Sequence, residues 1–280
     1  MFELQPTDTL DALRERLVAG PFLVLTGAGI STASGIPDYR DAHGVRRGNP
    51  PIMHQDFVTQ AATRKRYWAR AMIGWQGVAR ALPNPAHLAL AQLQRAGHVS
   101  RVITQNVDGL HDAAGNAGVI ELHGNLHRVA CMDCGKLLPR ADVQQALEQD
   151  NRYLQDVHAV LAPDGDALLA ERFLQGFQVP HCPCCGSDRL KPDVVFFGGG
   201  VSAGQADAAW QAVEQAPALL VVGTSLMAYS SFRLCQHLSR EGKPLFAINL
   251  GRTRADGLLA LKVEQPCQDV LPWLAERLRA

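Results

Sequence analysis

The segment Pro21-Phe-Leu-Val-Leu-Thr26 is a short, continuous apolar run, and Gly27-Ala-Gly29 follows it directly. Such a run is typical of a strand that is buried on both faces of a parallel sheet. Glycines directly after a strand permit a tight turn and let backbone N–H groups approach a pyrophosphate, and Ser31 and Ser34 add hydroxyl donors. The segment departs from the common Gly-x-Gly-x-x-Gly fingerprint because Thr32 stands where the third glycine would be. A plain strand-to-helix turn therefore remains the alternative.

The same pattern recurs further along the chain. Three more apolar runs end on small or polar residues: Val99–Thr104 before Gln105-Asn106, Ala218–Val222 before Gly223-Thr224-Ser225, and Pro244–Ile248 before Asn249-Leu250-Gly251. Helical patterns lie between the runs, and Asp8–Val18 predicts a helix at the start of the chain. This alternation predicts an α/β fold with a Rossmann-like, doubly wound parallel sheet that binds its ligand at the carboxyl ends of the strands.

The composition is that of a globular protein and excludes several classes of partner. The 280 residues carry 27 Lys+Arg and 27 Asp+Glu, so the net charge is zero and a basic nucleic-acid face is not expected. No apolar run approaches the length that spans a membrane. The first residues contain Glu3, Asp8 and Asp11 rather than a basic start with an apolar centre, so we expect no leader and a cytoplasmic protein.

Four of the seven cysteines form two C-x-x-C pairs, Cys131/Cys134 and Cys182/Cys185. Each pair places two thiolates on one tight turn, and two such turns facing each other make a closed tetrahedral site for one structural Zn per chain. Cys184 is expected to be a bystander, because only Cys182 and Cys185 keep the x-x spacing with a glycine after the last ligand. A redox-active C-x-x-C pair is the alternative.

Two segments interrupt the alternation of strands and helices. Residues 41–75 are rich in arginine, histidine and aromatic side chains, and residues 127–190 contain both cysteine pairs. We expect these two insertions to form a small helical, zinc-binding domain. Residues 1–40, 76–126 and 191–280 are then expected to form the Rossmann-like dinucleotide-binding domain.

Six motifs in order along the chain resemble those of the sirtuins, which are NAD-dependent protein deacylases. The motifs are Gly27–Arg40, Gln105-Asn106-Val107-Asp108-Gly-Leu-His111, His123-Gly-Asn125, Lys191–Gly198, Gly223-Thr224-Ser225 and Asn249-Leu250-Gly251. The likeness covers nearly the whole chain, and it is closest to the mitochondrial-type class II branch, whose members are credited with lipoamidase or ADP-ribosyltransferase activity.

The resemblance implies which residues bind NAD. The implied contacts are Gly27, Ala28, Gly29, Ser31, Asp38, Tyr39, Arg40, Gln105, Asn106, Val107, Asp108, Gly223, Thr224, Ser225, Asn249, Leu250, Gly251 and Cys267. Asn106 and Asp108 also join His123 in the catalytic set that the resemblance implies. A histidine titrates near neutral pH, so His123 suits a general base that takes a proton from a ribose hydroxyl. A core histidine is the alternative.

The acyl-lysine substrate is expected to meet two further groups of residues. The resemblance implies that the peptide lies extended between Val195-Phe196-Phe197-Gly198 and the loop Met227–Ser230. Tyr67 and Arg70 share a face of a predicted helix, and a Tyr-x-x-Arg pair of this kind marks the branch that acts on succinyl- and glutaryl-lysine. A solvated basic face is the alternative, because residues 64–66 are all basic.

The resemblance thus implies NAD-dependent removal of acyl groups from protein lysines, with nicotinamide and an O-acyl-ADP-ribose as products. Protein ADP-ribosyl transfer, a lipoamidase-type deacylase with weak deacetylase activity and a non-catalytic NAD sensor are the alternatives. Three departures stand out: Tyr39 stands at the reaction centre where many relatives have a phenylalanine, whereas two changes concern the substrate cleft. In the cleft, Gly199 replaces a glutamate and Met227–Ser230 lacks a proline. The oligomeric state is left open, and a monomer is compatible with the sequence.

Overall fold

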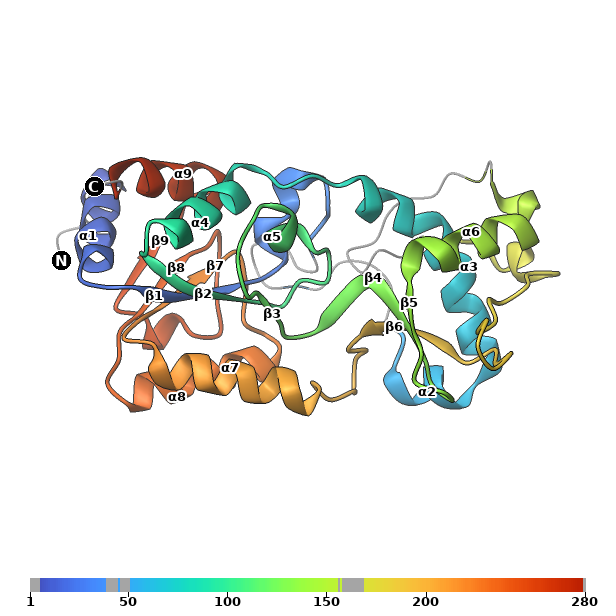
Figure 1. Ribbon diagram of the computed structural model, residues 1–280. Coiled ribbons are helices and arrows are strands. Elements are labelled where there is room, and N and C mark those ends of the chain that lie inside the picture. Colours follow the sequence, from blue (N-terminus) through green and yellow to red (C-terminus); the bar gives the residue numbers. More distant parts are fainter. Residues whose placement is uncertain (1–5, 39–44, 46–50, 156, 158–168, 279–280) are drawn as a thin grey trace.

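The computed structural model describes residues 6–38, 45, 51–155, 157 and 169–278. Its larger sheet has six parallel strands in the order β3-β2-β1-β7-β8-β9 (Figure 1). The strands are β1 (Phe22–Thr26), β2 (Val99–Thr104), β3 (Ile120–Glu121), β7 (Leu219–Val222), β8 (Leu245–Ile248) and β9 (Leu261–Val263). The four predicted strands are confirmed, and the short edge strands β3 and β9 were not predicted.

Helices cover both faces of this sheet, as the doubly wound prediction requires. One face is covered by α1 (Pro6–Val18), α4 (Pro85–Arg95) and α9 (Cys267–Arg277), and the other by α7 (Ala203–Gln215) and α8 (Tyr229–Arg240) (Figure 1). Phe22 and Val24 of β1 pack into the first core, whereas Leu23 and Leu25 pack into the second. Because successive side chains of a strand point to opposite faces, the unbroken apolar run of β1 follows from burial on both sides.

A smaller antiparallel sheet has the order β5-β4-β6 and lies at the other end of the molecule (Figure 1). Its strands are β4 (Gly124–Cys131), β5 (Leu137–Pro139) and β6 (Leu190–Val194), and its helices are α2 (His54–Thr59), α3 (Ala61–Arg80) and α6 (Arg140–Asp150). Phe57, Trp68, Leu147 and Leu190 lie in a separate core here. The two segments that interrupt the sequence pattern thus supply most of one compact unit.

Short helices complete the secondary structure. They are α5 (Leu110–Ala113) and the 3-10 turns η1 (Ala28–Ile30), η2 (Thr32–Ser34), η3 (Arg152–Leu154), η4 (Glu171–Leu174) and η5 (Asp256–Leu258). The turns η1 and η2 follow β1 directly. The chain passes from β1 to β2 on one side of the sheet and later enters β7 on the other side, so the strand order reverses at β1. A crevice for a ligand is expected at the carboxyl end of β1 for this reason.

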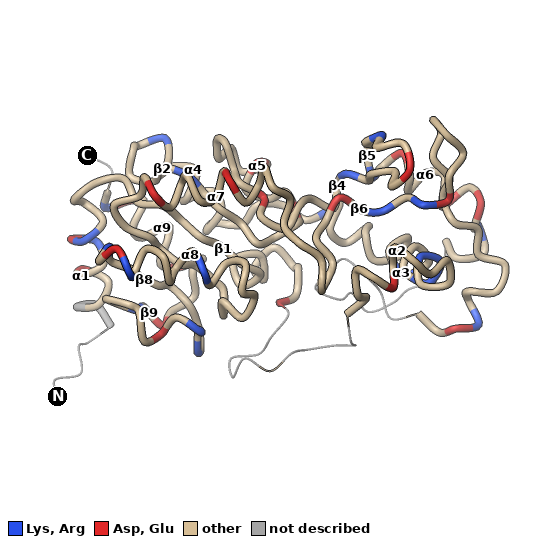
Figure 2. The backbone as a smooth tube through the Cα atoms, turned by 90° about the horizontal axis from the view of Figure 1, so that it is seen from below, with Lys and Arg blue, Asp and Glu red and all other residues tan. Residues whose placement is uncertain are grey.

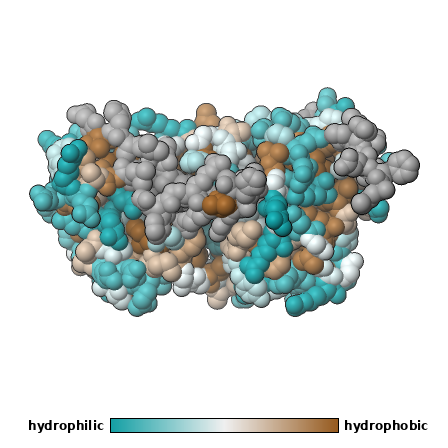
Figure 3. Space-filling view, turned by 180° about the vertical axis from the view of Figure 1, so that it is seen from behind, coloured by the Kyte–Doolittle hydropathy of each residue, from teal (hydrophilic) through white to brown (hydrophobic). Residues whose placement is uncertain are grey.

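Charged residues of both signs occur along the described chain. Basic and acidic positions alternate along the tube in both parts of the molecule (Figure 2), and the described residues of the rear face are a mixture of hydrophilic and apolar groups (Figure 3). Among the described residues, no helix combines the length and apolar character needed to cross a membrane.

Candidate functional site

A cavity of about 800 Å³ opens at the reversal of the strand order. Loops after β1, β2, β7 and β8 form its wall on the larger sheet, and β6 with α3 closes it from the smaller one. Nineteen of the predicted site residues line it: Gly27, Ala28, Gly29, Asp38, Tyr67, Gln105, Asn106, Val107, His123, Val195, Phe196, Phe197, Gly198, Gly223, Thr224, Ser225, Asn249, Leu250 and Cys267. The ends of four separate strands therefore meet at one cleft.

Two glycine-bearing loops cross in direct contact at the floor of this cleft. A Cβ on Gly29 would lie 2.8 Å from the carbonyl oxygen of Gly223, and a Cβ on Gly223 would lie 2.5 Å from the nitrogen of Ile30. Gly223 also has a φ of +58°, which side chains other than that of glycine rarely adopt. The Gly29 N–H donates to the Gly223 carbonyl across 2.8 Å. The glycines thus permit the two loops to touch, in addition to allowing the tight turn after β1.

His123 lies on the wall of the cleft between the two sheets, and both of its ring nitrogens are bound. Nδ1 is 3.0 Å from the carbonyl oxygen of Gln105, and Nε2 is 2.9 Å from the hydroxyl of Ser230. A carbonyl oxygen only accepts hydrogen bonds, so Nδ1 carries the proton of the neutral ring and Nε2 is an acceptor. Burial lowers the pKa of His123 below its ordinary value, against the opposing effect of the Gln105 hydrogen bond. The ring is therefore a neutral base at pH 7.

The side chain of Gln105 is held by its neighbours rather than left free in the cleft. Its Nε2 donates to Thr224 Oγ1 across 2.9 Å and to the Thr26 carbonyl across 3.2 Å. Its Oε1 accepts from Ser231 Oγ at 2.8 Å. These side-chain bonds join the end of β1, the loops after β2 and β7 and the first turn of α8, so they hold in place the residue whose carbonyl oxygen contacts His123.

Ser31, Asn106 and Asp108 form a polar group at the base of the cleft. Ser31 Oγ donates to Asp108 Oδ2 across 2.7 Å and accepts from Asn106 Nδ2 at 3.0 Å. Asn106 Nδ2 also donates to the Gly27 carbonyl, and the Leu110 N–H donates to Asp108 Oδ1. Ser31 and Asp108 are buried, whereas Asn106 lines the cleft. Asn106 is thus the member of this group that faces the cleft.

Two buried histidines lie behind this group. His111 ends the motif Gln105–His111, but neither histidine was assigned a role from the sequence. The rings of His87 and His111 are 4.9 Å apart, and His87 Nε2 is 3.5 Å from Ser31 Oγ. Burial, with a smaller effect of the neighbouring His111, lowers the pKa of His87 to about 3. Burial also lowers the pKa of His111 to about 4, against the opposing charge of Asp108. Both rings are therefore neutral and serve as hydrogen-bonding groups in the protein interior.

Tyr67 brings the aromatic core of the smaller sheet to the surface of the cleft. Its ring packs edge-to-face on Phe57, Phe196 and Trp68, with centroids 5.4, 5.4 and 5.3 Å away. Tyr67 and Phe196 both line the cavity. This part of the cleft is therefore an apolar, aromatic wall.

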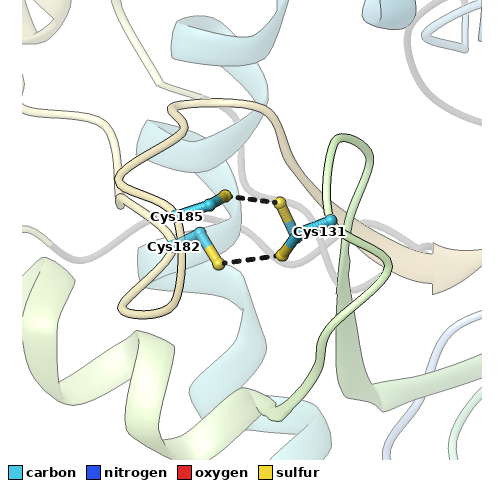
Figure 4. Close-up of side chains that lie close together, drawn as sticks. Cys131, Cys182 and Cys185 are labelled. Carbon is cyan, nitrogen blue, oxygen red and sulfur yellow. Dashed lines mark hydrogen bonds between the residues drawn. The ribbon is translucent and has the colours of Figure 1, made fainter.

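The four cysteines of the two C-x-x-C pairs converge at the far side of the smaller sheet. Their sulfur atoms all lie within 4.8 Å of one another, with Cys131 and Cys185 3.6 Å apart and Cys134 and Cys182 3.7 Å apart (Figure 4). A tetrahedral zinc with Zn–S bonds near 2.3 Å requires sulfur atoms about 3.8 Å apart. Cys184 is exposed and lies outside the cluster, as predicted. The donor set and its spacing therefore fit one structural zinc ion.

The Sir2 family profile matches residues 27–230. The chain belongs to the Sir2 family. The NAD-dependent protein deacetylase 3 of Pseudomonas syringae pv. tomato is 56% identical over 278 residues, which cover 99% of each chain. An NAD-dependent protein deacetylase of Bordetella bronchiseptica is 52% identical over 263 residues, covering 94% of this chain and 96% of the relative. The resemblance to the sirtuins is thereby confirmed.

Solved Sir2 structures share the whole architecture. One Sir2 enzyme, from work on Sir2 mechanism and regulation, superposes with a TM-score of 0.76 at 29% identity and covers 97% of this chain and 98% of its own. A Sir2 structure with a p53 peptide and NAD+ gives a TM-score of 0.75 at 30% identity, with 96% and 98% covered. The agreement extends over both sheets of this Sir2-family chain.

Some predicted site residues do not line the cavity of this Sir2-family chain. Ser31 and Asp108 lie beneath it, and Arg70 and Gly251 are absent from its lining. Tyr39 and Arg40 lie outside the described residues. Several lining residues had no assigned role: Thr32, Pro51, Ile52, Leu126, Val194, Ile248, Arg252, Gln265, Pro266 and Gln268. Proximity in sequence to Gly29, Asn249 and Cys267 was the available signal for Thr32, Arg252 and the glutamines.

Proposed function

We propose that this Sir2-family protein removes acyl groups from lysine side chains of proteins and consumes NAD in doing so. The observation that supports this most directly is the His123 imidazole, which is neutral, fixed by the Gln105 carbonyl and placed on the cleft wall with Nε2 as an acceptor. A base in this state is suited to take a proton from a ribose hydroxyl. The names of the relatives, which are NAD-dependent protein deacetylases, agree with this assignment.

The cleft offers a separate place for each part of the two substrates. We assign the loops at Gly27–Gly29 and Gly223–Ser225 to the pyrophosphate and ribose of NAD, with Asn249, Leu250 and Cys267 at the adenosine end. Asn106 and Val107 follow Gln105, whose carbonyl oxygen contacts His123, and both line the cleft. We assign them to the nicotinamide end. Tyr67, Phe196 and Phe197 line the opposite side, where the acyl-lysine would enter.

Zinc has no part in these steps. Cys131, Cys134, Cys182 and Cys185 would hold the ion, which would brace the smaller sheet because so small a unit has little core of its own. The described cysteines form no disulfide, which suits a reducing compartment, and we propose a cytoplasmic enzyme whose oligomeric state is left open.

The function is tested by measuring nicotinamide and deacylated peptide in one reaction with NAD and a panel of acyl-lysine peptides. We expect one nicotinamide for each acyl group removed, and loss of both products in His123→Ala. The matched control is His237→Ala, which removes a half-buried imidazole outside the cleft. Transfer of labelled ADP-ribose to protein without loss of acyl groups would support the alternative activity, and untouched NAD with every peptide would refute the proposal.

A further inference from the structure

The first turn of α8 places two adjacent serine hydroxyls on the machinery around His123. Ser230 Oγ is 2.9 Å from His123 Nε2, and Ser231 Oγ donates to Gln105 Oε1 across 2.8 Å. Ser230 lines the cleft, whereas Ser231 is fully buried. The two contacts therefore hold the base and the residue behind it from a single helical turn.

The position of the single N–H hydrogen on the neutral His123 ring decides which partner donates in the hydrogen bond with Ser230. Nδ1 donates to the Gln105 carbonyl, so Nε2 of the neutral ring has a lone pair and no hydrogen. The Ser230 hydroxyl must then be the donor. Within the described residues Ser230 Oγ has no other hydrogen-bond partner, so its hydrogen is committed to the lone pair that a base needs for its function.

We propose that Ser230 is a positioning residue that holds the His123 ring with Nε2 aimed into the cleft, and that a ribose hydroxyl of the co-substrate replaces the Ser230 hydroxyl at Nε2. This inference rests on the function proposed above. Gln105 alone constrains the ring at one nitrogen, which leaves it free to swing about the Nδ1–H···O contact. The second contact removes that freedom, because a ring held at two nitrogens has one orientation.

The two hydroxyls occupy His123 Nε2 one after the other. Without nucleotide, Nε2 accepts from the Ser230 hydroxyl. When the nucleotide enters, its ribose hydroxyl donates to Nε2 and the Ser230 hydroxyl turns away toward the cleft. The proton that the base later accepts then comes from the ribose oxygen, and the Ser230 hydroxyl keeps its own.

The test compares Ser230→Ala, Ser230→Thr and the control Ser239→Ala, which removes a hydroxyl from the last turn of the same helix. With Ser230→Ala we expect KM for NAD to fall by about three- to tenfold, because the nucleotide no longer has to displace one hydrogen bond. The kcat should stay close to the wild-type value, because the Ser230 hydroxyl has already left Nε2 in the nucleotide complex. Ser230→Thr keeps the hydroxyl and should retain most of the activity, and Ser239→Ala should match the wild type.

A second measurement does not depend on activity. In nucleotide-free protein labelled with ¹⁵N-histidine, the Nε2 resonance of His123 reports whether that nitrogen accepts a hydrogen bond. We expect it to move downfield in Ser230→Ala and to stay in place in Ser230→Thr and Ser239→Ala. An unchanged Nε2 resonance in Ser230→Ala overturns the inference, even if no acyl-peptide is turned over. So does a KM for NAD in Ser230→Ala that equals that of the wild type.

Discussion

The hydroxyl of Ser31 donates to Asp108 Oδ2 across 2.7 Å, and neither residue lines the cleft above it. Ser31 has no exposed surface and Asp108 is 6% exposed, so the bond is shielded from water. Asn106, which does line the cleft, donates to the same hydroxyl. Ser31 and Asp108 are therefore connected to the cleft through Asn106.

Replacing Ser31 with alanine should weaken the fold and the active site together. The Oδ2 atom of Asp108 would lose its donor, and an unpaired buried acceptor costs about 1–3 kcal/mol. Chemical denaturation of Ser31→Ala, Asp108→Asn and the double variant measures the coupling. We expect the double variant to lose less stability than the two single losses added together. Strict additivity would show that the two side chains do not depend on each other.

The buried histidines predict a loss of stability in mild acid. His87 has a pKa of about 3 and His111 of about 4 in the folded protein, against 6.5 when the chain is unfolded. The unfolded state therefore binds more protons below pH 6.5. Their contribution to stability is complete above pH 6.5 and is lost as the pH falls from 6.5 toward 4, at about 1.4 kcal/mol per pH unit for each histidine.

Denaturant unfolding at pH 7.5, 6.5 and 5.5 measures this dependence. The wild type should lose stability more steeply than His87→Gln, because that variant has only His111 left to titrate in the pair. Thr26, Ser31, Asn84, Asp108 and Asn116 face the two rings, and Asp108 is the charged group among them. Equal slopes for the two proteins would contradict the buried neutral pair.

The acidic limb of activity should report on His123. Burial lowers the pKa of this residue, so the base stays neutral to a pH below 6.5. We expect kcat/KM to be constant near neutral pH and to fall as the pH drops through that lowered pKa. A pH profile of kcat/KM for the acyl-peptide, measured at saturating NAD, gives the midpoint of this acidic decline. A midpoint at or above pH 6.5 would show that His123 is not the titrating base.

Parts of this structure follow from short-range sequence patterns, and other parts do not. The four central strands were predictable because burial on both faces leaves an unbroken apolar run, as in Phe22–Thr26. The edge strands β3 and β9 have two and three residues, too few to show a pattern. The cysteine cluster was predictable because the turn spacing itself fixes the ligand geometry.

The hidden part of the site depends on contacts between distant segments. His87 reaches Ser31 from helix α4, where it looks like any residue on a buried helix face. Gly29 and Gly223 touch across two loops, and nothing in either loop alone indicates the other. Ser230 was noted only as part of the loop that flanks the peptide and lacks a proline, yet it contacts the predicted base directly. Local patterns thus located the site, whereas the hydrogen bonds and contacts between its residues could be seen only in the tertiary structure.

Removing the metal should unfold the smaller sheet first. Cys131 and Cys182 are part of its hydrophobic core, so the loss of their shared ion frees both β4 and the turn before β6. We expect about one zinc per chain by metal analysis, and rapid amide exchange over β4–β6 after chelation while β1, β2, β7 and β8 stay protected. Cys134→Ser should behave like the chelated protein and Cys184→Ser like the wild type. Full protection without metal would refute a structural role.

The acyl preference should depend on Tyr67 and Arg70 in different ways. Tyr67 lines the cleft and is 5% exposed, whereas Arg70 is not among the lining residues. Tyr67→Phe keeps the ring contacts with Phe57 and Phe196 and removes only the hydroxyl. It should leave acetyl-lysine turnover nearly unchanged and slow glutaryl-lysine turnover, since a hydroxyl can donate to a carboxylate.

Mass spectrometry of a mixed acyl-peptide panel, run with the wild type, Tyr67→Phe and Arg70→Ala, gives all the ratios of glutaryl-lysine to acetyl-lysine turnover at once. If Arg70 pairs with an acidic acyl chain, Arg70→Ala lowers the glutaryl to acetyl ratio by about tenfold or more. An unchanged ratio in both variants would exclude these two side chains as the source of acyl selectivity.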